Sequence, residues 1–174
     1  ATITLKDFGL VGVDSFANDT LLDVEKLNAV VNLTSLFKDS YKISKIELVR
    51  PTLNAIVNAD SLANWDIVVE DSLEVMEEEE SAPLKLNLKK FTVEDLKVTY
   101  ASIPDSMSAA VENVDLNLKG DLALDIETLA DIKELKLIVD KIVYEDNTTS
   151  GTKAVLENVD LDFNGKVSDR TSKL

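Results

Sequence analysis

The stretch "LKLNLKKFTVEDLKVTY", Leu84 to Tyr100, carries the pattern that decides the fold. Its apolar residues fall at positions 84, 86 and 88, then at 91 and 93, and then at 96, 98 and 100. Alternation of apolar and polar residues is typical of a strand with one buried face. A slip of one residue would turn every later side chain to the wrong face, so a bulge or tight turn must restore the register. We predict such a feature at "VEDL", Val93 to Leu96.

The same alternation recurs in Val114–Leu118 and Thr52–Asn58, and a sheet with one polar face is commonly antiparallel. "LLDVEKLNAVVNL" (Leu21–Leu33) suits either a helix or a strand, and we favour a strand. A short turn capped by Thr34 is predicted through "SLFKD", and "IETLAD" (Ile126–Asp131) is predicted to be a polar turn or a short helix. The predicted fold is mainly β: a long twisted antiparallel sheet of repeated strand units, as a half-pipe or a flattened sandwich, with one or two short helices.

An internal repeat supports this prediction. "VENVDLNLKG" (Val111–Gly120) returns as "LENVDLDFNG" (Leu156–Gly165), and "LKVTY" (Leu96–Tyr100) corresponds to "DKIVY" (Asp140–Tyr144). Each unit is expected to be a strand, a loop, a strand ending in Gly, and a further strand. Such a unit cannot bury its apolar face alone, so neighbouring units should continue one sheet.

We expect one structural domain with three parts. Residues 1–70 form an N-terminal strand unit, 71–83 an acidic loop, and 84–174 two β repeats that continue the same sheet. Four consecutive glutamates, Glu77–Glu80, repel one another and favour a solvated loop, with calcium binding as the minor alternative. The chain starts at Ala1 without Met and its second repeat stops at Leu174, so we expect a piece of a longer protein.

The composition excludes several classes of function. With 18 basic and 33 acidic residues the formal charge is −15, which disfavours binding to nucleic acid or to anionic membrane surfaces. The absence of histidine and cysteine removes thiol nucleophiles, His general bases and zinc sites built on these residues. No phosphate-binding loop or nucleophile elbow occurs, and no pair of acids is singled out for catalysis. We predict that the chain is not an enzyme and has no catalytic residues, cofactor or metal site.

One motif resembles the start of a calcium loop. "DLDFNG" (Asp160–Gly165) matches D-x-D-x-N-G, but the twelfth position, which should be a bidentate glutamate, is Thr171. In the other repeat the equivalent places are Asp115, Asn117 and Lys119, and a lysine would oppose a cation. We therefore interpret the motif as the polar face of a strand.

The stretch "ISKIELVRPTLNAIVNADSLANWDIV" (Ile43–Val68) resembles the N-terminal signature of the AsmA-like family, in the TamB-like superfamily of repeating β-groove proteins. The neighbouring "TLLDVEKLNAVVNLTSLFKDSYKI", "LKLNLKKFTVEDLKVTYAS" and "AAVENVDLNLKGDL" resemble that family's adjoining strands. Two features depart from the family pattern: Ser61 stands where glycine is usual, and an acidic insertion precedes Pro83. The positions that match the signature are Ile46, Leu48, Pro51, Leu53, Asn64, Trp65 and Asp66.

The resemblance implies a non-enzymatic domain on the periplasmic side of the inner membrane of a Gram-negative bacterium, held by a membrane anchor outside this chain. It implies a part in outer-membrane biogenesis, in which phospholipid or another acyl lipid is shielded or guided along an apolar β groove, and envelope proteins as further partners. The lipid-facing candidates are Leu84, Leu86, Leu88, Val98, Leu116, Leu118, Leu135, Leu137, Leu161 and Phe163.

Two other classes of function are retained. One is a structural or protein-interaction scaffold with a closed core and no lipid ligand, which recruits partners through an edge strand. The other is a carbohydrate-binding β-domain, which needs exposed aromatic rings. The candidates in this chain are few: Trp65, Tyr41, Tyr100 and Tyr144.

The "NWD" tripeptide, residues 64–66, is interpreted as a corner of the fold. Trp65 is expected to plug the end of the sheet, while Asn64 and Asp66 bond free backbone groups of the turn. Full burial of the ring would make Trp65→Ala cost roughly 3–5 kcal/mol of stability. Pro51, Asn64, Trp65 and Asp66 are thus assigned structural roles.

Overall fold

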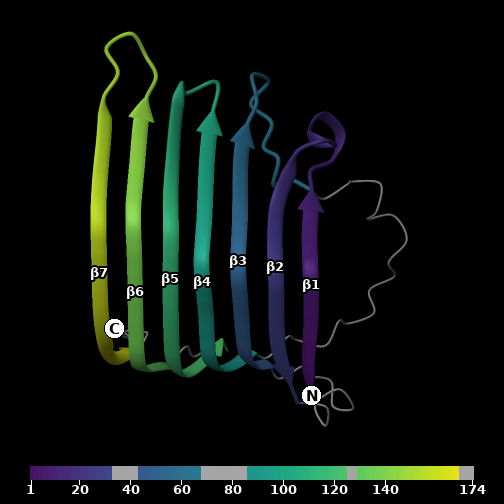
Figure 1. Cartoon of the computed structure of the whole chain (residues 1–174), viewed down its shortest axis with the longest axis vertical. Coiled ribbons are helices and arrows are strands. Elements are labelled where there is room, and N and C mark those ends of the chain that lie inside the picture. Colours follow the sequence, from purple (N-terminus) through teal and green to yellow (C-terminus); the bar gives the residue numbers. More distant parts are fainter. Residues whose placement is uncertain (33–42, 68–85, 125–128, 169–174) are drawn as a thin grey trace, which may run out of the picture.

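A computed structural model describes residues 1–32, 43–67, 86–124 and 129–168, and these form one seven-stranded sheet (Figure 1). The strands follow one another across the sheet in chain order, and one 3-10 turn, η1 (Asp14–Phe16), joins the first two. Their bounds are β1 Thr2–Val11, β2 Thr20–Val31, β3 Ile43–Val57, β4 Leu86–Ser102, β5 Met107–Leu124, β6 Leu129–Asp146 and β7 Lys153–Ser168.

The predicted mainly β fold is confirmed, with two corrections. The sheet is mixed, because β3 and β4 run parallel while every other neighbouring pair is antiparallel. Parallel neighbours need a crossover of a dozen or more residues, and residues 58–85 provide that length. The second correction concerns the helices: among the described residues the only helical element is η1. Of the two segments for which a turn or short helix was predicted, "SLFKD" and residues 126–128 lie outside the described residues. Residues 129–131 belong to β6. The strand favoured for Leu21–Leu33 is confirmed as far as Val31.

Every strand changes the facing of its side chains near its middle, and β4 and β6 have a further irregularity nearer one end. In β4 the register shifts between Val93 and Leu96, as predicted, and Asp95 there has a φ of 52°. Positive φ values between 48° and 56° occur at the same level in four further strands, at Asp7, Arg50, Asn113 and Asn158. Such a conformation costs a non-glycine residue roughly 1–2 kcal/mol, and neighbouring groups offset it. The N–H of Asp95, for example, donates to Asp115 Oδ1 over 2.9 Å.

The described residues form a single layer. Their buried apolar side chains are few. Val24, Val93, Val114 and Val139 lie near the mid-strand kinks, whereas Leu21, Val31 and Leu88 lie near strand ends and Phe16 lies in η1. The sheet is open, so the flattened-sandwich form of the prediction does not hold for the described residues.

The two sequence repeats correspond to two hairpins, β4–β5 and β6–β7. Their glycines, Gly120 and Gly165, lie inside β5 and β7, so the expectation that each strand ends at its glycine is wrong. At Gly120 the register shifts, and a Cβ would lie 2.2 Å from the carbonyl oxygen of Asp131 on β6. Glycine is needed there because two backbones approach closely.

Candidate functional site: the apolar face of the sheet

The register of the seven strands gathers apolar side chains on one face, because directly paired residues in neighbouring strands point to the same side. Three transverse rows cross all seven strands without a polar residue. From β1 to β7 these rows are Ile3, Ala29, Ile46, Phe91, Leu118, Leu135 and Phe163; Leu5, Leu27, Leu48, Val93, Leu116, Leu137 and Leu161; and Leu10, Leu22, Leu53, Val98, Val111, Ile142 and Leu156. We call this surface the apolar face.

The mid-strand kinks keep this face continuous. The first two rows lie on one side of the kinks and the third lies on the other, so each strand must slip at the same level for the rows to share a face. In β5 the slip is the step from Val111 to Val114 past Asn113, whose φ is 52°. Without that step, half of the apolar side chains of β5 would point to the opposite face.

Most of the predicted lipid-facing residues lie on this face. Leu84 is outside the described residues, and Leu86 begins β4 without a described side chain. Leu88 is buried. Val98, Leu116, Leu118, Leu135, Leu137, Leu161 and Phe163 belong to the three rows given above. On the outermost strand, Leu161 and Phe163 are 46% and 43% exposed.

The contribution of β1–β3 to this face was missed from the sequence. All ten candidates came from residues 84–163, yet Leu5, Leu27 and Leu48 complete the same rows. The signal was present in "ATITLKD", where Ile3 and Leu5 alternate with polar residues. What the sequence alone lacked was the pairing of β3 with β4, which joins the two halves of the chain into one face.

The opposite face is polar and holds ion pairs. A row on this face from β1 to β7 reads Thr4, Asn28, Glu47, Thr92, Asn117, Lys136 and Asp162. Lys45 bonds Glu47 over 2.7 Å, and this contact, together with Lys90, holds the pKa of Glu47 below its ordinary value of 4.5. These pairs are exposed and contribute little to stability, so this face is a solvated surface.

The motif that resembles a calcium loop is part of the polar face. Asp160 and Asp162 lie in β7, opposite Ile138 and Lys136 of β6, and Lys136 Nζ lies 3.8 Å from Asp162 Oδ2. Its interpretation as a strand is confirmed. Among the described residues, no three acidic side chains are grouped so that they could hold a metal ion.

The "NWD" corner differs from its prediction in the residue that is buried. Asn64 is 1% exposed, and its side chain bonds the free edge of β3: the Ile56 N–H donates to Oδ1 over 2.9 Å, and Nδ2 donates to the Asn54 carbonyl over 2.7 Å. Trp65 is 47% exposed, so the expectation that it plugs the end of the sheet is wrong. The indole instead stacks obliquely on Tyr100, with ring centroids 6.3 Å apart.

The other signature residues also have defined places. Pro51 is buried in the middle of β3, directly after Arg50, whose φ is 48°. Asp66 is exposed, and its backbone N–H, not its carboxylate, closes the turn by donating to the Ala63 carbonyl over 3.2 Å. Ser61 adopts a left-handed φ of 62°, the conformation for which glycine is better suited.

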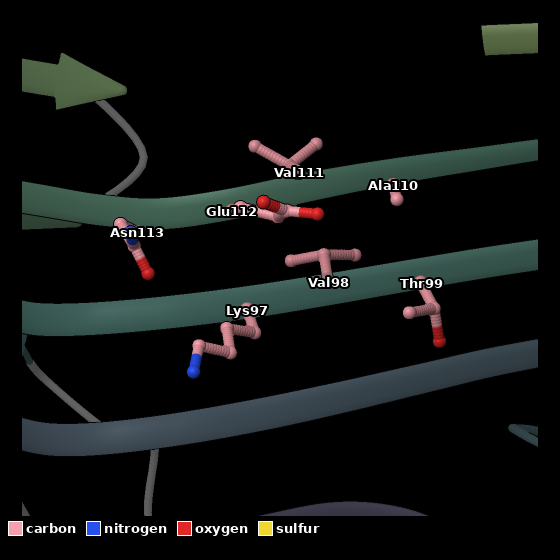
Figure 2. A pocket seen from close by; sticks show the side chains of 7 residues that line it. All are labelled: Lys97, Val98, Thr99, Ala110, Val111, Glu112 and Asn113. Atoms are coloured by element: carbon pink, nitrogen blue, oxygen red, sulfur yellow. The ribbon is translucent and has the colours of Figure 1, made fainter. Parts of the chain in front are cut away.

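A shallow depression of about 440 Å³ lies between β4 and β5 (Figure 2). Lys97, Thr99, Ala110 and Glu112 of the polar face line it, together with Val98, Val111 and Asn113. It forms where the β4–β5 register is irregular and the small side chain of Ala110 leaves space. The depression is open to solvent and contains no buried titratable group, so it does not suggest a catalytic site.

No protein-family model and no curated protein matches this chain. Within the described ranges, none of the elements is a helix of the length and apolar character needed to cross a bilayer. The apolar face is the candidate functional site of the described residues.

Proposed function

We propose that this chain is a non-enzymatic, AsmA-like domain of the Gram-negative periplasm, anchored to the inner membrane outside this segment, whose apolar face shields or guides phospholipid acyl chains during outer-membrane biogenesis. The observation that supports it most is the set of three uninterrupted apolar rows across seven strands, with no second layer over them among the described residues. Soluble monomers rarely expose a contiguous apolar patch larger than a few hundred Å² unless it binds something.

An acyl chain suits such a face energetically. Each methylene that leaves water contributes about 0.8 kcal/mol, so even a partly covered chain gains several kcal/mol. The face offers aliphatic side chains and no charge within the three rows. Binding of this kind makes and breaks no covalent bond, in agreement with a sequence that has neither histidine nor cysteine.

The proposal is tested by lipid uptake. The purified protein should co-purify with phospholipid on mass spectrometry and should take up a fluorescent phospholipid in titrations. Protein that carries no lipid and takes up none would refute the proposal and favour the scaffold role, for which the unpaired outer edges of β1 and β7 are the relevant surfaces.

A matched pair of double variants locates the lipid on the correct face. Leu161→Gln with Phe163→Gln changes two side chains of the apolar face that are 46% and 43% exposed. Ile138→Gln with Val155→Gln changes two side chains of the polar face that are 43% and 48% exposed. We expect the first pair to reduce uptake severalfold and the second to leave it unchanged. Equal losses would mean that the lipid is not bound by the apolar face.

A further inference from the structure

The apolar face ends in a row where aromatic rings alternate with alanines. Across β3 to β7, the paired residues are Ala55, Tyr100, Ala109, Tyr144 and Ala154. Trp65 extends this row, because its ring contacts that of Tyr100 at 6.3 Å between centroids. We call Trp65, Tyr100 and Tyr144 the aromatic row.

The alanines leave the rings uncrowded. Neighbouring strands lie about 4.8 Å apart, so Tyr100 on β4 and Tyr144 on β6 are separated by roughly 10 Å with only the methyl group of Ala109 between them. Trp65 and Tyr144 are 47% and 38% exposed. Tyr and Trp combine an apolar ring with a polar N–H or O–H, and for that reason they concentrate where hydrocarbon meets water in membranes.

Beyond the aromatic row lies the end of the sheet formed by the turns at residues 12–19, 58–67, 103–106 and 147–152, which we call the turn end (upper end in Figure 1). These turns contact one another: the Ile103 N–H donates to the Val57 carbonyl over 3.0 Å, and the Asn147 N–H donates to the Ser106 carbonyl over 2.6 Å. The turn end is therefore a connected rim next to the aromatic row.

The turn end is strongly acidic. Its turns hold five acidic residues and no basic one: Asp14, Asp19, Asp60, Asp66 and Asp105. The adjoining ends of β6 and β7 add Glu145, Asp146 and Lys153. Lys153 is paired with Glu145. The hydroxyl and backbone N–H of Thr148 hold the pKa of Asp146 below its ordinary value, so this carboxylate stays ionised at neutral pH. Such a rim repels a net-anionic group and attracts an ammonium group.

We propose that the aromatic row marks the head-group end of the lipid site, and that the acidic turn end selects a zwitterionic, ammonium-bearing phospholipid over a net-anionic one. This inference rests on the proposed function, because it orients and identifies a lipid on the same face. The acyl chains then lie along the three apolar rows, away from the turn end. The glycerol and ester region lies against Tyr100, Tyr144 and Trp65, whose polar tips can bond it.

Trp65 is the only tryptophan of the chain, so its fluorescence reports the orientation directly. Two labelled forms of phosphatidylethanolamine are compared at equal, measured stoichiometry. One carries a nitroxide on the head group, and the other carries it near the end of an acyl chain. We expect the head-group label to quench Trp65 at least about twofold more, because quenching requires near contact with the ring. Equal quenching, or stronger quenching by the chain-end label, would overturn the orientation. Trp65→Phe is the fluorescence blank.

Head-group selection is measured by uptake of phosphatidylethanolamine and phosphatidylglycerol with identical acyl chains. We expect roughly a three- to fivefold preference for the ethanolamine lipid at low salt, as exposed charge interactions give, and a smaller one at high salt. Asp60→Lys with Asp66→Lys should abolish the preference. Asp160→Lys with Asp162→Lys makes the same change of charge on the polar face of β7 and should keep it.

The outcomes separate the two proposals. Uptake of both lipids to the same extent overturns the head-group selection and leaves the proposed function standing, whereas uptake of neither removes both. A soluble oligosaccharide that shifts Trp65 fluorescence in lipid-free protein would show the aromatic row to be a sugar platform and would overturn the inference.

Discussion

Replacing Asn64 by Ala tests how the end of β3 is held. The Asn64 side chain accepts from the Ile56 N–H over 2.9 Å and donates to the Asn54 carbonyl over 2.7 Å, and it is 1% exposed. Each bond contributes about 1 kcal/mol net, and a backbone group left buried without a partner costs a further 1–3 kcal/mol. Because the edge of β3 is only partly buried, water replaces some of the lost bonding. We expect Asn64→Ala to lower the free energy of unfolding by about 2–4 kcal/mol.

Urea unfolding followed by far-UV circular dichroism measures this loss. With a slope of about 2 kcal/mol/M, the midpoint should fall by about 1–2 M. Asn64→Asp sharpens the test, because the introduced carboxylate keeps the acceptor for Ile56 and faces the Asn54 carbonyl without a proton to donate. Burial beside that carbonyl should raise the pKa of the introduced carboxyl above its unfolded-state value of about 4. Its stability relative to wild type should therefore improve as the pH falls through the raised pKa, and should level off below about 4.

Trp65→Leu is the comparison that separates the buried amide from its exposed neighbour. The indole is 47% exposed, and leucine keeps part of its apolar contact, so the expected cost is about 1 kcal/mol. A loss below about 1 kcal/mol for Asn64→Ala, together with a larger loss for Trp65→Leu, would refute the assignment of Asn64 as the residue that closes the corner.

Three further changes follow from local geometry. Gly120→Ala should lower the free energy of unfolding by about 1–3 kcal/mol, measured by thermal or urea unfolding, because its Cβ would lie 2.2 Å from a backbone oxygen of β6. Gly9→Ala is the control and should be almost neutral, because its Cβ would lie 3.6 Å from the nearest atom. Equal effects of the two changes would contradict the close approach at Gly120. Ser61→Gly should stabilise the protein by about 0.5–1 kcal/mol, since φ is 62° there, and a loss would mean that its turn is not left-handed. The bond from Lys119 holds the pKa of Glu134 below 4.5, so the stability it contributes is present above that pH and disappears as the pH falls through the lowered value. The difference in unfolding free energy between wild type and Glu134→Gln should accordingly shrink on acidification, and a difference that is constant from neutral pH to acid would exclude the linkage.

The strands and the mid-strand slip of β4 could be predicted because both are local properties of the sequence. Alternation identifies a strand, and the spacing from Val93 to Leu96 identifies the bulge, without knowledge of any partner. The parallel pairing of β3 with β4 could not be predicted, because nothing in either strand encodes its neighbour and one-sided strands are most often antiparallel.

The two residues of the corner show why burial is harder to predict than structure type. A lone tryptophan suggested a buried ring, since large aromatic side chains dominate most cores. Among the described residues the open sheet has no second layer to receive Trp65, and the ring lies on the surface beside Tyr100. Asn64 is buried because β2 begins at Thr20, which leaves the end of β3 without a neighbouring strand on that side. That cause depends on strand lengths and pairing, which residues 64–66 do not encode.

The positions of the kinks bear on whether the apolar face is a binding surface or an accident of an open sheet. Bulges are usually local, and one bulge in one strand would send half of that strand's apolar residues to the opposite face. Here the slips lie at one level in every strand, and five of them place a residue other than glycine at positive φ. Four of these five residues are Asp or Asn, whose short side chains tolerate this conformation, and the fifth, Arg50, bears a cost of roughly 1–2 kcal/mol. The residue types at the kinks therefore suit the aligned slips. The gain is an uninterrupted apolar surface on both sides of the kinks, which a long, flexible hydrocarbon ligand can use along its whole length.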